Sequence, residues 1–299
     1  PRWPRRQHNA LILPGFHASK IAHIVIPAKA GILCHKQEKL VTIKVGIAGL
    51  GAIGSTVARA LAAGIPGMTL HAVSDPRRPL DLPVPYLDLE TLAKECDLIV
   101  ECLPAAVVPE MCRHAFQYGK NILIISSAAL LIYPEILDQL KSTKSRILVP
   151  NGAIAGLDGV QSLAQNRVIS IQITSTKNPV GFRNSPYILE NKINLELIKK
   201  KQMLFSGNAR EAARAFPANV NVAATLSLAG IGPERTKVEI WADPDIQTNI
   251  HEILAEGEFT RISTRVESMP DPANPKTSLL AAQSIIATLK GLTAPLVIL

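Results

Sequence analysis

The chain has 299 residues, which is enough for one large domain or two smaller ones with a sizeable core. Its net charge of +8 suggests a nucleic-acid partner, but residues 1–40 carry seven Lys and Arg against one acid, and the remainder holds 25 basic and 23 acidic residues. The later part is therefore close to neutral. We expect no nucleic-acid partner and no membrane span.

Residues 1–40 show no sustained helical or strand periodicity and no clean apolar segment before a cleavage site, so they do not resemble a signal peptide. We expect a disordered or non-native extension. Our hypothesis is that the natural protein begins at Val41, where a non-ATG start codon could have been read as valine. The four cysteines lack metal-ligand spacing, and we interpret them as buried thiols in a cytoplasmic protein without a metal site.

The most informative stretch begins with an apolar run, 43–48, which is typical of a buried strand in a parallel sheet. It leads into a Gly-x-Gly-x-x-Gly motif and then a helical pattern that Gly64 ends. In a dinucleotide-binding turn the first glycine permits the turn, the second lets the backbone approach the pyrophosphate, and the third lets helix and strand pack closely. The motif predicts that NAD or NADP binds at Gly49, Gly51, Ala52, Ile53 and Gly54.

The second strand is predicted at 70–74, and an acid follows it. Asp75 comes 21 residues after Gly54, where an acid takes the ribose hydroxyls of NAD. Arg77 and Arg78 could instead meet the 2′-phosphate of NADP, so the choice between the two cofactors stays open.

Strand and helix patterns alternate from residue 43 to residue 149. The helices are expected at 89–95, 107–118 and 133–142, and the further strands at 97–102, 121–126 and 146–149. This alternation predicts an α/β fold, with a Rossmann-type doubly wound parallel sheet in a dinucleotide-binding domain at 41–150.

The pattern changes at residue 151, and we expect a second, mixed α/β (α+β) substrate and catalytic domain at 151–275. Its strands are predicted at 168–176, 236–242, 249–255 and 259–266, with a capping box at 208–211 and a helix from Pro217 to Leu228. The last segment, 276–299, contains an amphipathic helix from Thr277 to Leu289 that is expected to pack back on the nucleotide domain.

Three histidines follow the first forty residues. His251 lies in the second domain, where a substrate facing the nicotinamide would be held, and histidine is the usual side chain for proton transfer near neutral pH. We therefore expect a general acid or base that titrates within a unit or two of about pH 6.5, with a place on a strand surface as the alternative. His71 is expected in the core or at the edge of a strand, and His114 on a helix surface.

Two clusters place a lysine beside hydroxyl and amide groups, at 176–179 and 274–278. A lysine near the free N–H groups of a helix start suits a carboxylate, and solvated loops are the alternative. Asn219 and Asn221 lie in the expected first turn of a helix, where a simple cap is the alternative. The candidate substrate-binding residues are Lys177, Lys276, Thr277 and Ser278.

The residues from Val45 to the C-terminus resemble the L-aspartate dehydrogenase family. The matching stretches are Gly-Ile-Ala-Gly-Leu-Gly-Ala-Ile-Gly (46–54), Asn-Gly-Ala-Ile-Ala-Gly-Leu-Asp-Gly (151–159), Phe-Pro-Ala-Asn-Val-Asn-Val-Ala-Ala-Thr-Leu (216–226), Asn-Ile-His-Glu-Ile (249–253) and Asn-Pro-Lys-Thr-Ser (274–278). The family's catalytic histidine falls on His251, and two further cofactor contacts fall on Ala153 and Asn221. The chain departs from the family at 126–130 and 175–179.

The resemblance implies an NAD(P)-dependent enzyme acting on a CH–NH2 group. L-Aspartate would lose a hydride to give iminoaspartate, which is hydrolysed to oxaloacetate and ammonia or passed to NAD biosynthesis. We also expect a homodimer or higher homo-oligomer. The rivals are a homoserine-dehydrogenase-like or dihydrodipicolinate-reductase-like enzyme, and a non-catalytic NAD(H)-sensing protein, for which an empty second site would be typical.

Overall fold

The structure is a computed structural model that describes residues 42–271 and 274–298, without the side chains of residues 270–277. The expected extension at 1–40 and the hypothesised start at Val41 lie outside the described residues. Within the described part, no helix has the length and apolar character needed to cross a membrane.

The first sheet is five-stranded, entirely parallel, and ordered β2-β1-β3-β4-β5. Its strands are β1 (Ile43–Ala48), β2 (Met68–Ser74), β3 (Leu98–Glu101), β4 (Asn121–Ile124) and β5 (Ile147–Leu148). The chain leaves β1 for β2 on one side and then crosses to β3 on the other. A ligand crevice is expected at this switch point, outside the carboxyl ends of β1 and β3.

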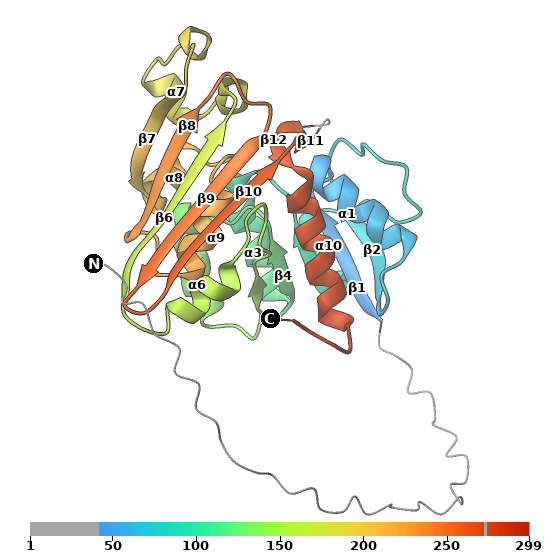
Figure 1. Cartoon of the computed structure of the whole chain (residues 1–299). Coiled ribbons are helices and arrows are strands. Elements are labelled where there is room, and N and C mark those ends of the chain that lie inside the picture. Colours follow the sequence, from blue (N-terminus) through green and yellow to red (C-terminus); the bar gives the residue numbers. More distant parts are fainter. Residues whose placement is uncertain (1–41, 272–273, 299) are drawn as a thin grey trace, which may run out of the picture. The chain divides into compact units, whose positions relative to one another are not determined.

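Helices cover both faces of this sheet, which confirms the predicted doubly wound fold (Figure 1). On one face, α1 (Ala52–Ala63) packs with α10 (Leu279–Thr293) on side chains such as Val45 and Ile47. On the other, α2 (Leu89–Glu95) and α3 (Val108–Gln117) pack on side chains such as Ile99 and Ile122. The short helices α4 (Ala128–Ile132) and α5 (Glu135–Leu140) follow β4.

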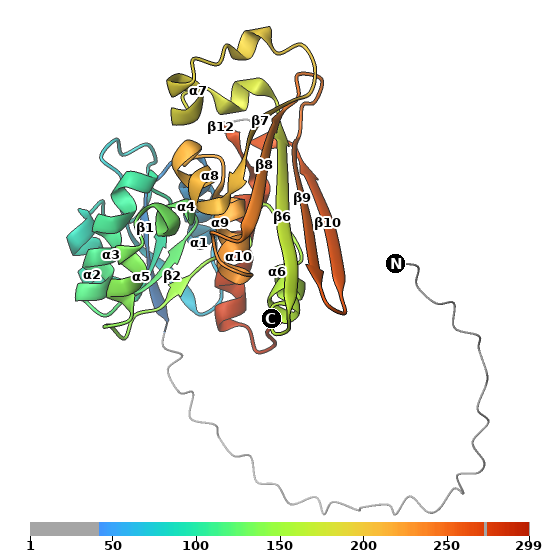
Figure 2. The same ribbon diagram turned by 90° about the vertical axis from the view of Figure 1, so that its left-hand side faces the viewer.

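The second sheet is mixed and ordered β10-β9-β6-β8-β7. It consists of β6 (Val168–Lys177), β7 (Gln202–Asn208), β8 (Thr236–Ala242), β9 (Asn249–Gly257) and β10 (Arg261–Ser268). Helices α6 (Leu157–Leu163), α8 (Ala209–Ala215) and α9 (Asn221–Ala229) cover one face, while α7 (Pro186–Glu190) lies beyond the end of the sheet (Figure 2). The predicted capping box is present, since Asn208 and Glu211 exchange hydrogen bonds at the start of α8.

The last helix packs on the nucleotide-binding part of the chain. The buried side chains Ala282, Ile285 and Leu289 of α10 belong to the same apolar cluster as Val57 and Leu61 of α1. Before it, β11 (Pro270–Asp271) and β12 (Asn274–Ser278) form a small hairpin that leads from the second sheet to α10. The helix begins at Leu279 rather than Thr277, because Ser278 is its N-cap and accepts from the backbone N–H of Leu280.

Two other predictions are wrong. The helix expected from Pro217 begins at Asn221, because residues 217–219 form a turn that carries Asn219 toward the second sheet. His114 was expected on a helix surface, but it is buried, because α3 packs against α2 as well as the sheet and its covered face is wider than its apolar stripe.

Candidate active site

The glycine turn between β1 and α1 has the geometry that its sequence predicts. Gly49 has a φ of +91°, and a Cβ there would lie 2.4 Å from the carbonyl oxygen of Cys102. A Cβ on Gly54 would lie 1.9 Å from the carbonyl oxygen of Gly49. Gly51 is the N-cap of α1, and a Cβ there would meet no protein atom within 4 Å. The first and third glycines therefore serve close packing, whereas the second leaves space for a ligand.

A groove of about 830 Å³ opens beside this turn. Gly49 to Gly54 line it together with Asp75, the loop 102–107 after β3, the residues Ile125 and Ser126 after β4, and Asn221 at the start of α9. The predicted cofactor residues Gly49, Gly51, Ala52, Ile53, Gly54, Asp75 and Asn221 are thus brought together. A site at the switch point, beside the N-terminus of a helix, suits a dinucleotide with an anionic pyrophosphate.

The carboxylate of Asp75 is held from two sides. Its Oδ2 accepts from the backbone N–H of Leu50 at 2.9 Å, and the guanidinium of Arg77 donates to Oδ1 and Oδ2 at 3.1 and 3.0 Å. The hydrogen bonds from Arg77 are the largest cause that lowers the pKa of Asp75 to about 2, and the bond from Leu50 adds to it. The acid is therefore ionised and fixed beside the turn, while the Arg77 side chain is 71% exposed above it.

A smaller hollow of about 70 Å³ adjoins the groove. The two share Ile53, Ile125, Ala218 and Asn221 as lining residues. The hollow adds Ala153 and three polar groups from separate parts of the second sheet and α10, namely Lys177, His251 and Ser278. The fold therefore brings the predicted proton-transfer residue and two of the predicted substrate residues next to the predicted cofactor residues.

His251 lies on β9, directly opposite Ser175 of β6 in the antiparallel register. The two side chains form a hydrogen bond between Ser175 Oγ and His251 Nδ1 at 2.9 Å, and His251 is only 3% exposed. Burial lowers the pKa of His251 to about 3, and the positive charge of Lys177 acts in the same direction. The titration expected near pH 6.5 is therefore wrong, because that expectation assumed a solvated imidazole.

Lys177 is the last residue of β6 and is 5% exposed. Its Nζ donates to Oδ1 of Asn219 at 3.4 Å, and burial lowers the pKa of the ammonium to about 8. Because this value is above neutral pH, the side chain is mainly positively charged near pH 7. A buried cation next to a small hollow is the kind of group that binds a substrate carboxylate.

Asn221 connects the two halves of the site. Its Oδ1 accepts from the backbone N–H of Ala128 at 3.1 Å, and its carbonyl oxygen accepts from Ser127 Oγ at 2.8 Å. Ser127 Oγ also contacts Thr225 Oγ1 at 2.9 Å, so the loop after β4 is fastened to α9. The departure from the family at 126–130 lies in this loop, and Ser127 holds the second part of the site against the first.

The described residues place none of the remaining sequence candidates in the hollow. The side chains of Lys276 and Thr277 lie outside the described residues. His71 on β2 is half-buried and lies 3.5 Å from Glu95, away from the hollow. Within the described residues, no group of three or more His, Cys, Asp or Glu side chains is placed to hold a metal ion.

Three polar residues of the site were missed by the sequence analysis, namely Glu101, Ser175 and Asn249. For Glu101 a signal was present, because an acid at the end of a buried strand is as unusual as Asp75 at the end of β2. For Ser175 and Asn249 the only signal was their place in the stretches 175–179 and 249–253 that were compared with the family, because only the pairing of β6 with β9 brings the two positions together.

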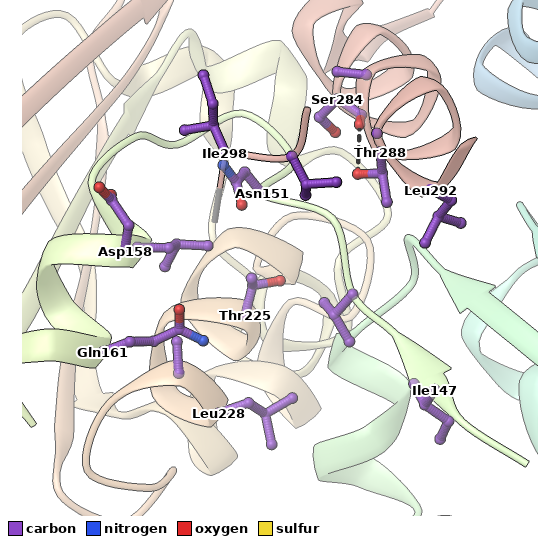
Figure 3. A pocket seen from close by; sticks show the side chains of 16 residues that line it. Ile147, Asn151, Asp158, Gln161, Thr225, Leu228, Ser284, Thr288, Leu292 and Ile298 are labelled. Atoms are coloured by element: carbon purple, nitrogen blue, oxygen red, sulfur yellow. Dashed lines mark hydrogen bonds between the residues drawn. The ribbon is translucent and has the colours of Figure 1, made fainter. Parts of the chain in front are cut away.

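Another hollow, of about 760 Å³, lies farther along α9 toward its C-terminal end, where Thr225, Leu228 and Ala229 line it (Figure 3). Thr225 lines both this hollow and the small one beside His251. Figure 3 shows Asn151, Ser284 and Leu228 around it, and a hydrogen bond from Thr288 to the backbone of Ser284. None of the predicted site residues lines it.

The parallel sheet, the glycine turn and the groove at its switch point define a dehydrogenase that uses NAD or NADP, as the sequence predicted. Sequence models agree: residues 49–150 match "Homoserine dehydrogenase, NAD binding domain", and residues 158–292 match "Aspartate dehydrogenase, C-terminal". The chain belongs to the L-aspartate dehydrogenase family.

Individual relatives agree with this assignment. L-Aspartate dehydrogenase 3 of Bordetella bronchiseptica is 42% identical over 260 residues, which are 84% of this chain and 95% of that protein. The L-aspartate dehydrogenase of Methanosarcina acetivorans is 41% identical over 266 residues, or 85% of this chain and 98% of the relative. The crystal structure of aspartate dehydrogenase from Thermotoga maritima superposes with a TM-score of 0.68 at 26% identity, covering 86% of this chain and 99% of that one.

Proposed function

We propose that the chain catalyses the NAD(P)-dependent oxidative deamination of L-aspartate to iminoaspartate, which is hydrolysed to oxaloacetate and ammonia or supplied to NAD biosynthesis. The observation that carries the proposal is the hollow beside the cofactor groove, in which a buried ammonium, Lys177, lies with a neutral imidazole, His251. An anion-binding group and a base are the two functions that deamination of an acidic amino acid requires.

The groove fits the cofactor that the family implies. Gly51 leaves open space at the N-terminus of α1 for the pyrophosphate, and Asp75 stands at the end of β2 for the adenosine ribose. Asn221 lines both the groove and the hollow, and Ala153 lines the hollow, where the nicotinamide end would lie. When bound, the nicotinamide accepts the hydride that leaves Cα of the substrate.

The substrate carboxylates would be bound from two sides of the hollow. Lys177 supplies a positive charge at the end of β6, and Ser278 lies at the N-terminus of α10, a helix of 15 residues with free backbone N–H groups in its first turn. Lys276 and Thr277 precede that helix, and we propose them as further carboxylate ligands. A substrate with two carboxylates can use both groups, whereas alanine can use one.

His251 would act as the base. Its Nδ1 faces Ser175, so a neutral tautomer that donates from Nδ1 to Ser175 Oγ leaves the lone pair of Nε2 for a proton. That lone pair can take a proton from the substrate ammonium, or from the water that attacks the imine. Because its pKa is about 3, His251 is already unprotonated across the neutral range.

The test is a nicotinamide absorbance assay with L-aspartate, L-glutamate and L-alanine, and in reverse with oxaloacetate plus ammonia. We expect aspartate to support reduction of NAD or NADP far faster than the other two amino acids. Equal rates with alanine would contradict the dicarboxylate site. Binding of NADH without turnover of any of these substrates, or of homoserine, would favour the sensing protein instead.

We further propose a cytoplasmic homodimer or higher homo-oligomer, with residues 151–275 as the substrate and catalytic domain. The second sheet supports assembly, because α6, α8 and α9 cover only one of its faces (Figure 2). The half-buried side chains Thr174, Trp241 and Leu254 alternate with buried ones along the strands, and the face they form is available to a second copy of the chain. Light scattering of the purified protein gives the mass directly, and a monomer at micromolar concentration would contradict the assembly.

A further inference from the structure

An acid without an assigned role lies under the cofactor groove. Glu101 is the last residue of β3, between Ala48 of β1 and Ile124 of β4, and it is 0% exposed. Within the described part of the chain it forms no ion pair with a Lys, Arg or His, and burial is the main influence on its carboxyl group. A buried carboxylate is costly unless hydrogen bonds compensate for the lost water.

The hydrogen bonds of Glu101 join the two loops that follow β3 and β4. One carboxylate oxygen accepts from the backbone N–H of Leu103 at 2.5 Å, and the other accepts from that of Ser126 at 3.1 Å. Ser126 Oγ in turn donates to the carbonyl oxygen of Leu103 at 2.8 Å. These three bonds form a closed connection, which we call the Glu101 clamp, between residues 103 and 126.

The clamp sets the shape of the groove at two places. The residues that it fixes line the groove themselves, because the loop 102–107 and residues 125–126 form its wall. The peptide next to Leu103 also bears on the glycine turn, since a Cβ on Gly49 would lie 2.4 Å from the carbonyl oxygen of Cys102. A shift of the loop after β3 would therefore move the wall and press on the turn.

We propose that Glu101 is a positioning residue for the nicotinamide cofactor, which holds the loops after β3 and β4 at the spacing that NAD(H) binding requires. The proposal needs a strong acceptor at both oxygens, and the ionised carboxylate provides this because neither oxygen carries a hydrogen. Protonation turns one oxygen into a hydroxyl and removes the negative charge, so that both bonds lose their charged acceptor and the one at the hydroxyl oxygen is weakened most.

The clamp should therefore depend on pH. Burial is the main cause that raises the pKa of Glu101 to about 7, while the bonds from Leu103 and Ser126 oppose it. The titratable groups that face it are the thiols of Cys102 and of Cys112 on α3, and burial raises the pKa of each of them. In the groove itself, the pKa of Asp75 is about 2. Of these four groups, Glu101 is the one whose pKa lies between pH 6 and pH 7.5.

The first experiment measures the dissociation constant of NADH by fluorescence at a series of pH values from about 5.5 to 7.5, without substrate. We expect the affinity to fall about tenfold as pH decreases through about 7, which corresponds to the loss of one hydrogen bond to a charged group. A constant affinity would overturn the proposal. An affinity that rises at low pH would also overturn it, because it would mean that the charge only repels the pyrophosphate.

The second experiment uses Glu101→Gln, which keeps the size but places an amide NH2 opposite one of the two backbone N–H groups. We expect NADH affinity at pH 7.5 to fall roughly tenfold and its pH dependence to disappear. Glu135→Gln, an exposed acid on α5 away from the groove, is the control and should behave as the wild type. A folded Glu101→Gln protein with wild-type affinity would show that Glu101 serves only the fold.

These outcomes are independent of the proposed substrate. Failure of the deamination assay would leave NADH binding to be measured as before, and a pH-independent NADH affinity would leave the aspartate site unaffected. If Glu101→Gln does not fold, the pH series on the unchanged protein still decides the question.

Discussion

Two glycines of the turn have different roles, so substituting each in turn tests packing and ligand binding separately. Gly54 serves the packing of α1, and Gly51 leaves space for a ligand. A Cβ on Gly54 would lie 1.9 Å from the carbonyl oxygen of Gly49, whereas a carbon and an oxygen in contact need roughly 3.3 Å. Helix α1 would have to move by more than about 1 Å away from the first sheet, although its other contacts with that sheet are closely packed and buried. Overpacking of this kind costs about 3 kcal/mol, so Gly54→Ala should lower Tm by roughly 6–12 °C.

Gly51→Ala should have the opposite profile. Its φ of −68° is open to alanine, and its Cβ would meet no protein atom within 4 Å, so Tm should change by no more than about 1–2 °C. The added methyl group would point into the groove, where the pyrophosphate is expected. We therefore expect NADH to bind at least about tenfold more weakly, a loss of about 1.4 kcal/mol.

The assay is thermal unfolding by circular dichroism together with NADH titration on the same preparations. Gly291→Ala in α10 is the matched control, because its Cβ would also meet no atom within 4 Å and the residue does not line the groove. It should keep NADH affinity with an equal or higher Tm. Wild-type NADH affinity in Gly51→Ala would refute the placement of the pyrophosphate, and an unchanged Tm in Gly54→Ala would refute the packing argument.

Three further predictions concern the polar groups of the site. His251→Ala should lower kcat by roughly 10²–10⁴ with little change in NADH affinity, and a folded variant above about a third of wild-type turnover would contradict a role in proton transfer. The pKa of Lys177 is lowered to about 8, so the ammonium loses its proton as pH rises through 8. Competitive inhibition of the wild-type enzyme by succinate should therefore weaken as pH rises above 8, and succinate should inhibit the Lys177→Met enzyme poorly at every pH. Asp75→Ala should weaken the binding of NAD more than that of NADP, because the free 2′-hydroxyl of NAD loses its acceptor whereas NADP carries a phosphate there. Equal increases in the two dissociation constants would show that Asp75 only holds Arg77 and the turn.

The parts of the molecule that sequence predicted well are those governed by local pattern. The apolar run of β1, the three glycines and Asp75 lie close together in the chain. Each role needs a particular residue type at a fixed short spacing, which can be recognised in a short stretch of sequence. The capping box at Asn208 and Glu211 is of the same kind, because both partners lie within one turn.

The parts that sequence could not supply depend on strand pairing and burial. Ser175 lies 76 residues from His251 in the chain and contacts it only because β6 and β9 are neighbours in one register. The expected titration of His251 failed for a related reason, since desolvation is set by everything packed around the ring. Pro217 is a local pattern that predicted the helix start wrongly. The helix begins at Asn221, because the residues after Pro217 form a turn that places Asn219 next to Lys177.

The two charge states in the hollow support catalysis over passive binding. Lowering the pKa of a lysine from 10.5 to about 8 corresponds to about 3 kcal/mol against the charged folded state, so Lys177 keeps its charge near neutral pH at a cost to stability. His251 costs nothing comparable at pH 7, because the imidazole is mostly neutral in the unfolded chain as well. A protein that only sensed NAD(H) would need neither group at the nicotinamide end of the groove. A cation kept at a cost beside an unprotonated imidazole fits the deamination of an anionic amino acid better than it fits passive binding.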